Sequence, residues 1–161
     1  LECHKSSILE IMRLKIPPVL IFAIFALGMY LLDRFLPVGE FDFFGRRQLA
    51  SMLLVMAVVV ALLALYQFKK AKTTTDPLAP EKAERLVVSG IYSYTRNPMY
   101  LAFLLILLAF GLKLGNAFNT LLAAGFVYFM NHFQIRHEET ALAQRFGKDY
   151  TIYLKAVRRW F

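Results

Sequence analysis

Long apolar stretches, each close to the length that an α-helix needs to cross a bilayer, recur along this chain. They occupy about residues 17–36, 49–68, 98–114 and 117–133. Because 58% of the 161 residues are hydrophobic, a soluble domain of this size could not bury all of them. The sequence therefore predicts an all-α fold: a single-domain integral membrane bundle of about four transmembrane helices.

Prolines and short connectors indicate where these helices begin and turn. Pro17 and Pro18 open the first stretch, where a helix tolerates missing amide donors. Asn97 is a favourable N-cap residue, and Pro98 then takes the first helical position of the third stretch. Since the connector at 113–119 is short, the third and fourth helices are expected to form an antiparallel hairpin.

Positive charge is concentrated in one set of loops. The leader (1–16), the main loop (69–97) and the tail (134–161) hold 3, 6 and 6 of the 19 Lys and Arg residues, which leaves 4 for the opposite side. The positive-inside rule then predicts that both termini are cytoplasmic, in the inner or plasma membrane of a bacterium. The net charge of +8 favours anionic membrane lipids as partners. No nucleic-acid partner is expected, because no groove-reading module is recognisable.

The C-terminal tail carries its own periodic pattern. Aromatic or apolar side chains recur at helical spacing, and basic side chains occupy another face. The first set is Phe146, Tyr150, Tyr153, Val157 and Trp160, and the second is Lys148, Lys155 and Arg159. This pattern predicts a cytoplasmic amphipathic helix along the membrane interface, either as an anchor or as the cover of a site.

Residues able to carry chemistry gather where the third and fourth helices meet the cytoplasm. One side supplies Tyr92, Tyr94, Arg96, Asn97 and Tyr100, and the other supplies Arg136, His137, Glu138, Glu139 and Arg145. Such groups beside a membrane are costly unless they pair or bind a ligand. Taken singly, each has a structural role as a topological anchor, a cap or a belt aromatic. Two adjacent carboxylates just after a helix are better explained by pairing or ligand binding.

Other chemistries lack the residues they need. His4 and His132 are isolated, and His137 has no second histidine at the spacing of a zinc helix, so no metal site is predicted. The single Cys3 excludes an intrachain disulfide. Hydrolysis is disfavoured because there is neither a nucleophile elbow nor a phosphate-binding glycine loop.

Three sequence motifs together resemble a known enzyme family. They are Gly90-Ile-Tyr92, the run Arg96-Asn97-Pro98-Met99-Tyr100, and Glu138-Glu139 leading into Arg145-Phe146-Gly147, Tyr150 and Tyr153. From about Pro77 to the C-terminus the chain resembles the membrane-embedded isoprenylcysteine carboxyl methyltransferases and their phospholipid N-methyltransferase relatives. The first two helices resemble that family in topology alone.

The resemblance implies S-adenosylmethionine bound at the cytoplasmic face and a lipid-like or prenylated acceptor arriving from the bilayer. Residues expected to contact the cofactor are Tyr92, Arg96, Asn97, Pro98, Tyr100, Arg136, His137, Glu138 and Phe146. Glu139 and Arg145 are the expected catalytic residues, facing the acceptor. Arg145 would hold an acceptor anion, and Glu139 would orient Arg145 or the ribose of the cofactor. For an amine acceptor, Glu139 would instead be the candidate base that takes a proton.

Carboxyl O-methylation of a prenylcysteine-like group is the leading reaction, and phospholipid amine N-methylation is the alternative. Asn97 stands where the prenylcysteine enzymes usually carry His, and the chain has fewer helices than many of them. A nicotinamide-dependent membrane reductase is a third enzyme hypothesis, with less support because this sequence has no additional basic cluster for a 2′-phosphate. A non-enzymatic membrane protein that binds lipid or a partner is the rival class.

Overall fold

The structure, a computed structural model, describes residues 16–36, 39–71 and 85–161. The predicted leader, apart from its last residue, and residues 72–84 of the predicted loop lie outside these ranges. Within them the fold is helical, with one isolated bridge between Glu40 and Asn116. The elements are α2 (Pro18–Phe35), α3 (Arg46–Ala71), the 3-10 turn η2 (Gly90–Ser93), α4 (Pro98–Leu114), α5 (Asn119–Phe129), the π-helical turn η3 (Met130–Ile135) and α6 (Arg136–Ala156).

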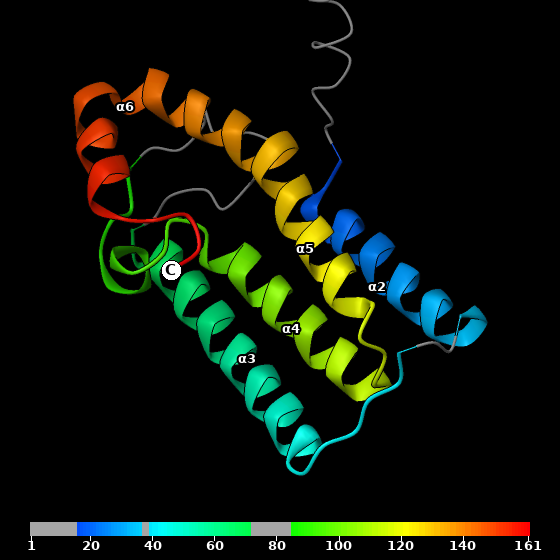
Figure 1. The fold of residues 1–161 in the computed structure, drawn as a ribbon. Coiled ribbons are helices and arrows are strands. Elements are labelled where there is room, and N and C mark those ends of the chain that lie inside the picture. The colour runs from blue at the N-terminus through cyan, green and yellow to red at the C-terminus, as the bar shows by residue number, and fades with distance from the viewer. Residues whose placement is uncertain (1–15, 37–38, 72–84) are drawn as a thin grey trace, which may run out of the picture.

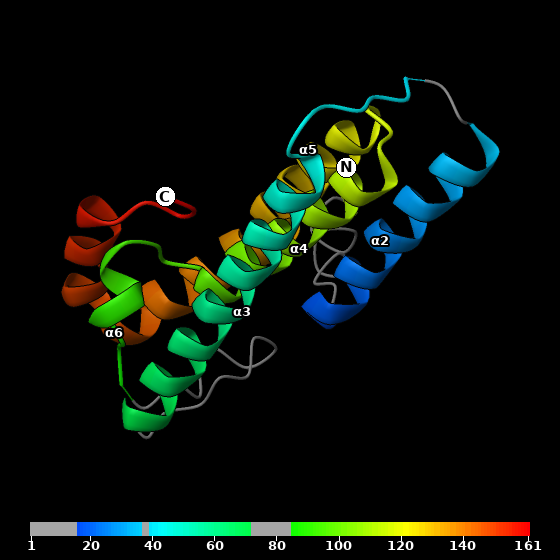
Figure 2. The same cartoon turned by 90° about the horizontal axis from the view of Figure 1, so that it is seen from below.

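Helix α4 is the centre of the bundle (Figure 1). It packs most extensively against α3 and also contacts α2 and α5, while α2 contacts α5 as well. The short connector between α4 and α5 returns the chain antiparallel, as the sequence predicted. The view from below shows α2 and α3 on opposite sides of the α4–α5 pair (Figure 2).

The turn after α4 stabilises one end of the bundle, which is the end opposite the start of α4. Gly115 ends α4 with a φ of 82°, a conformation that favours glycine. A Cβ at this position would lie 2.0 Å from Nη1 of Arg46, which donates to the carbonyl of Phe41 at 2.9 Å. The Phe41 and Ala117 amides donate to the carbonyls of Gly115 and Gly39, at 2.8 and 3.0 Å.

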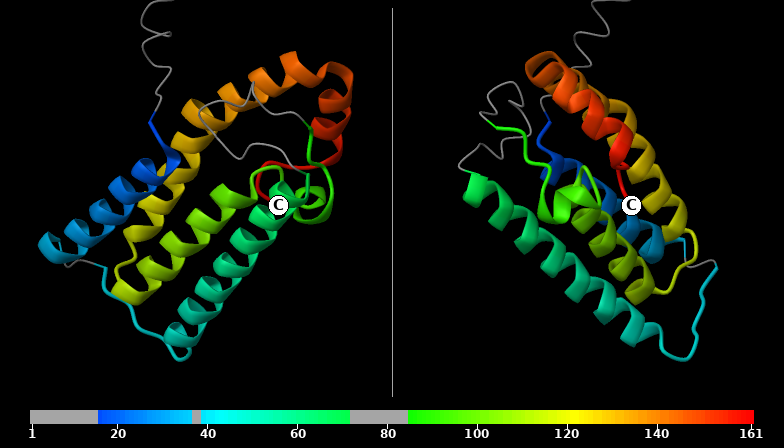
Figure 3. Two further views of the ribbon diagram at one scale, coloured as in Figure 1. Left: turned by 180° about the vertical axis from the view of Figure 1, so that it is seen from behind. Right: turned by 90° about the vertical axis from the view of Figure 1, so that its left-hand side faces the viewer.

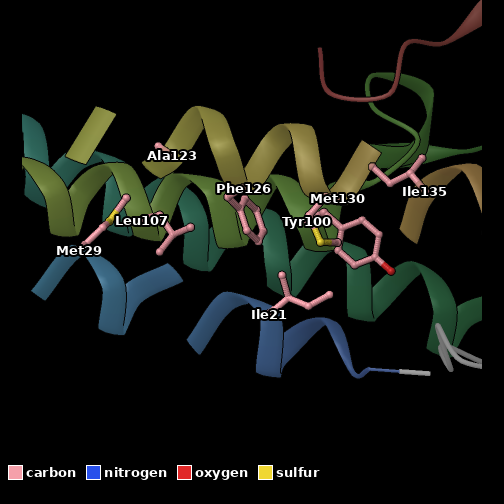
Figure 4. Close-up of a cluster of buried hydrophobic side chains, with 8 residues drawn as sticks. All are labelled: Ile21, Met29, Tyr100, Leu107, Ala123, Phe126, Met130 and Ile135. Atoms are coloured by element: carbon pink, nitrogen blue, oxygen red, sulfur yellow. The ribbon is translucent and has the colours of Figure 1, made fainter. Parts of the chain in front are cut away.

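A buried apolar cluster joins α2, α4 and α5 (Figure 4). Its members are Ile21, Met29, Tyr100, Leu107, Ala123, Phe126, Met130 and Ile135. Phe126 is fully buried, and Phe25 meets its ring edge-on at 5.6 Å between centroids. The cluster holds the hairpin against α2 and carries Tyr100 toward the site described below.

Much of the outer surface of α2 and α3 is apolar. Only 17% of the most apolar window of each helix is buried, although both helices are long and apolar enough to cross a membrane. Met52 and Val55 of α3, for example, are 68% and 63% exposed. Helix α4 is a shorter apolar helix of 17 residues. Large apolar faces turned outward suit lipid, so the chain is an all-helical membrane bundle, the fold class that the sequence predicted.

The fourth helix differs from its prediction. The sequence suggested a span ending near residue 133 and a separate tail helix, but α5 runs through η3 directly into α6 (Figure 3). No Gly or Pro lies between Gly125 and Gly147, so nothing in the sequence ends the helix, and the π turn absorbs an additional residue. The last helix of the bundle and the first part of the tail therefore form one continuous helix.

Gly147, within α6, interrupts this continuous helix. Its φ of 52° and ψ of −118° are non-helical, and α6 resumes in a new direction before ending at Ala156. Val157 is already extended, with φ −125° and ψ 137°. The predicted amphipathic helix reaching Trp160 is therefore wrong in its last turn, because the final residues leave the helix and return to the bundle.

Candidate functional site

A cavity of about 300 Å³ lies at the end of the bundle where α4 begins and α6 leaves, called the site end below. Its polar lining comes from Arg85, Tyr92, Arg96, Asn97, Tyr100, Glu138, Glu139, Tyr150 and Tyr153. Its apolar lining comes from Pro18, Val19, Leu65, Phe68, Leu86, Val87, Pro98, Met99, Phe103 and Leu142. A mostly apolar cavity with a few convergent polar groups is typical of small-molecule sites.

The C-terminal tail is bonded to the loop that precedes α4. The Tyr153 hydroxyl donates to the carbonyl of Tyr92 at 2.7 Å, and both residues are buried. The Arg96 amide donates to the carbonyl of Arg158 at 2.9 Å, and Thr95 Oγ1 donates to the carbonyl of Arg159 at 2.9 Å. Segments more than sixty residues apart in sequence therefore form one wall of the cavity.

A glycine allows the same loop to approach α3. Gly90 has a φ of +64°, and a Cβ there would lie 1.9 Å from the side-chain nitrogen of Gln67. A larger residue there would require the Gln67 side chain to move, and its backbone would be strained at this φ. The glycine of the first sequence motif thus has a direct packing role.

Asn97 occupies the N-cap position of α4, but its side chain does not cap the helix. Its Nδ2 donates to the carbonyl of Arg159 at 3.2 Å instead. The prediction that Asn97 caps α4 through its side chain was therefore wrong. The Arg159 carbonyl accepts from this amide in addition to its bond from Thr95 Oγ1.

Glu138 is the most deeply buried carboxylate of the site. Its Oε1 accepts hydrogen bonds from the Tyr100 hydroxyl and from Nε2 of Gln134, the latter at 2.7 Å. Burial raises the pKa of Glu138 to about 7, although these two hydrogen bonds act in the opposite direction, and the charge of Glu139 raises it further. Near neutral pH this group can therefore both hold and release a proton.

Glu139 lies between two arginines. Arg159 binds both of its oxygens, with Nε 2.9 Å from Oε1 and Nη2 2.6 Å from Oε2. Hydrogen bonding to Glu139 raises the pKa of Arg159. Arg96 places Nη1 3.0 Å from Oε1 in the ion pair, and its side chain is 11% exposed. Glu139 is therefore in contact with two guanidinium groups.

Arg96 nevertheless keeps unsatisfied donors. Its Nε and Nη1 are buried and have no hydrogen-bond acceptor in the part of the chain that the structure describes. The 3.0 Å contact of Nη1 with Glu139 meets the distance of an ion pair without the angle of a hydrogen bond. Unsatisfied guanidinium donors in a cavity fit an anionic ligand group.

The tyrosines of the cavity remain neutral. Burial, reinforced by the charge of Glu139, raises the pKa of Tyr150 to about 12, while the Arg96 charge partly offsets the rise. Burial also raises the pKa of Tyr92 and of Tyr153. Their rings give an aromatic wall with hydroxyls that do not ionise near neutral pH.

Seven of the predicted site residues line the cavity: Tyr92, Arg96, Asn97, Pro98, Tyr100, Glu138 and Glu139. Four others do not. Arg136, His137 and Arg145 are exposed, and Phe146 is half-buried with its ring 6.0 Å from the guanidinium carbon of Arg145. All four lie on α6, which Figure 1 shows running away from the helix bundle.

Four residues at or beside the cavity were not predicted as site residues: Arg85, Tyr150, Tyr153 and Arg159. The three-residue spacing of the two tyrosines indicated a shared helix face but not what that face covers. Arg159 comes near Glu139 only because the chain breaks at Gly147 and doubles back, for which the sequence carried no signal. Among the described residues, no group of three or more His, Cys, Asp or Glu could hold a metal ion.

The fold is thus an apolar helical bundle of the membrane type with a cavity at one end that is lined by apolar and charged side chains. Residues 46–149, more than half of the chain, match the family described as phospholipid methyltransferase. The chain belongs to this family, and its class is that of the membrane methyltransferases.

Two relatives are similar to this chain over part of its length. An uncharacterized protein of Haemophilus influenzae is 50% identical over 62 residues, which cover 38% of this chain and 98% of that protein. Protein-S-isoprenylcysteine O-methyltransferase of Schizosaccharomyces pombe is 37% identical over 76 residues, which cover 47% of this chain and 32% of that enzyme. No solved structure matches the chain.

Proposed function

We propose that the protein transfers a methyl group from S-adenosylmethionine to a hydrophobic or amphiphilic acceptor at the cytoplasmic face of the membrane. The leading reaction is O-methylation of the carboxylate of a prenylcysteine-like group. The observation that carries the proposal is the cavity itself, which combines unsatisfied Arg96 donors, two carboxylates and an aromatic wall beside apolar helix ends. The methyltransferase relative named above supports the same reaction.

The residues of the cavity fit S-adenosylmethionine in chemical character. Its carboxylate matches the free donors of Arg96, and its ammonium and ribose hydroxyls match Glu138. The adenine matches the tyrosine rings and Leu142. When bound, this group supplies an electrophilic methyl on a sulfonium.

The acceptor has an apolar route into the cavity. Val19 at the start of α2 and Leu65 near the end of α3 line the cavity and are 61% and 46% exposed. Both lie on helices that are apolar enough to span a bilayer. A prenyl or acyl chain could therefore enter the cavity from the lipid beside the start of α2 or the end of α3, while its polar head reaches the charged residues.

For a carboxylate acceptor the protein needs to align the reactants and exclude water, without a base. The acceptor oxygen forms the new bond to the methyl carbon as the bond from sulfur breaks. Arg85 lines the cavity and is a candidate to hold the acceptor anion, in the role first expected for Arg145. The apolar walls keep bulk water away from the reacting atoms.

Phospholipid amine N-methylation is the second candidate because one observation favours it. An ammonium acceptor must lose a proton before it can attack, and Glu138 has a pKa near 7, as a proton acceptor at neutral pH requires. Glu139, bound by two arginines, is less suited to that role.

The test begins with calorimetric titration of the detergent-purified protein with S-adenosylmethionine. Saturable binding is expected, and Arg96→Gln should weaken it, whereas Arg34→Gln at the opposite end of the bundle should not. Absence of binding to folded wild-type protein would refute the proposal and favour a non-enzymatic role.

Transfer of labelled methyl then identifies the acceptor. A farnesylated cysteine analogue with a free carboxylate should be labelled, and the same analogue with an esterified carboxylate should not. Label on phosphatidylethanolamine instead would select the amine reaction.

A further inference from the structure

We infer that Arg159 is a positioning residue: it occupies Glu139 and thereby keeps the Arg96 donors available for the anionic group of the ligand. The inference rests on the proposed function, since it takes the carboxylate of S-adenosylmethionine as that group. The C-terminal tail would then support ligand binding indirectly, without contacting the ligand.

Two arginines compete for one carboxylate in the site. Arg159 makes a bidentate pair with Glu139, at 2.9 and 2.6 Å, and so uses both carboxylate oxygens. Arg96 is as close, with Nη1 3.0 Å from Oε1, but does not achieve hydrogen-bond geometry. Arg159 therefore makes the hydrogen bonds to Glu139, whereas the buried Nε and Nη1 donors of Arg96 have no hydrogen-bond acceptor among the residues that the structure describes.

The tail holds Arg159 in place through bonds that do not involve its guanidinium. Its carbonyl accepts from Thr95 Oγ1 at 2.9 Å and from Asn97 Nδ2 at 3.2 Å. The next residue, Trp160, donates from Nε1 to Oδ1 of Asn131 at 3.0 Å. Changing the Arg159 side chain alone therefore leaves the path of the tail supported.

Loss of the Arg159 guanidinium should redirect Arg96. The Glu139 carboxylate is only 15% exposed, and a buried carboxylate deprived of its partner is strongly destabilised. Arg96 already lies 3.0 Å from Oε1 of Glu139 and has two donors without an acceptor among the described residues. A bidentate Arg96–Glu139 pair would then consume the donors that the ligand needs.

The experiment compares two nucleosides on the Arg159→Gln variant. S-adenosylhomocysteine carries the amino-acid carboxylate, whereas 5′-methylthioadenosine lacks it. We expect the variant to raise the Kd for S-adenosylhomocysteine about tenfold or more, the value of a lost charge-assisted hydrogen bond, and the Kd for 5′-methylthioadenosine less than about twofold. An equal change for both nucleosides would mean a general structural role and would overturn the inference.

A second variant removes the competitor. With Glu139→Gln added to Arg159→Gln, position 139 no longer carries a negative charge that could capture Arg96, so the affinity for S-adenosylhomocysteine should return to within about threefold of wild type. Failure of this rescue would also overturn the inference. Arg158→Gln, at the exposed neighbouring position, serves as the matched control and should leave both dissociation constants unchanged.

The two proposals fail in different ways. If the wild-type protein binds neither nucleoside, the proposed function is wrong and the inference falls with it. If the wild type binds S-adenosylhomocysteine and the variant keeps the same ratio of the two dissociation constants, the inference alone is wrong.

Discussion

Glu138 should make the stability of the protein depend on pH. Its pKa is about 7 in the fold against 4.5 for an ordinary glutamate, because burial disfavours the charged form. Since the folded pKa is the higher one, the contribution of Glu138 to stability is fully present below pH 4.5 and is lost as the pH rises through 7. The difference corresponds to at most about 3 kcal/mol, reduced by any water that enters the cavity.

The substitution that tests this is Glu138→Gln. Glutamine keeps an oxygen to accept from Tyr100 and Gln134 but cannot ionise. Below about pH 5 the two proteins should have similar stability, and at pH 8 the variant should be more stable than wild type by up to about 3 kcal/mol.

The assay is chemical denaturation in detergent, followed by tryptophan fluorescence of Trp160, with the free energy of unfolding measured at steps from pH 5 to pH 8 for both proteins. All other titrating groups are shared, so the difference between the curves reports Glu138. If the two proteins differed by the same amount at every pH, Glu138 would not be a buried group that titrates near neutrality, and the reasoning would be refuted.

Three further substitutions test the fold around the site, each by the free energy of unfolding in detergent. Gly147→Ala should lose about 1 to 3 kcal/mol, because its φ of 52° is strained for alanine although no atom lies within 4 Å of the added Cβ; an unchanged stability would contradict the kink. Phe126→Ala should lose about 3 to 5 kcal/mol from the fully buried core, whereas Phe44→Ala, at a fully exposed position, should lose little. Tyr153→Phe leaves the buried Tyr92 carbonyl without its donor and should lose about 1 to 3 kcal/mol, and a loss near zero would count against that bond.

The parts of the fold that the sequence predicted follow from local patterns. Apolar runs of near-bilayer length indicated helices α2, α3 and α4, and Pro98 marked the start of α4 correctly. The short connector after α4 implied a hairpin. Because a hairpin brings its two ends together, it also predicted that residues near 96–100 would meet residues near 138–139.

The errors share one cause, which is that helix direction depends on contacts distant in sequence. Nothing between residues 126 and 146 indicated a π turn, so the tail was expected to be a separate helix. Arg145 was assigned to the acceptor by resemblance, but α6 carries it beyond the cavity, while Arg85 comes in from a loop. Asn97 was expected to cap α4, but a carbonyl from the tail captures its side chain.

By itself, the sequence determined that this chain is a helical membrane protein with its polar chemistry at one end, because hydrophobic length and periodicity are properties of consecutive residues. Only the tertiary structure decided which charged groups face the cavity and how they pair. The reversal of the chain at Gly147 brings Arg159 back to Glu139, and two donors of Arg96 are left without a hydrogen-bond acceptor among the described residues. Pairing of charges across a cavity depends on distances of a few ångströms between segments far apart in sequence, and no local pattern encodes those distances.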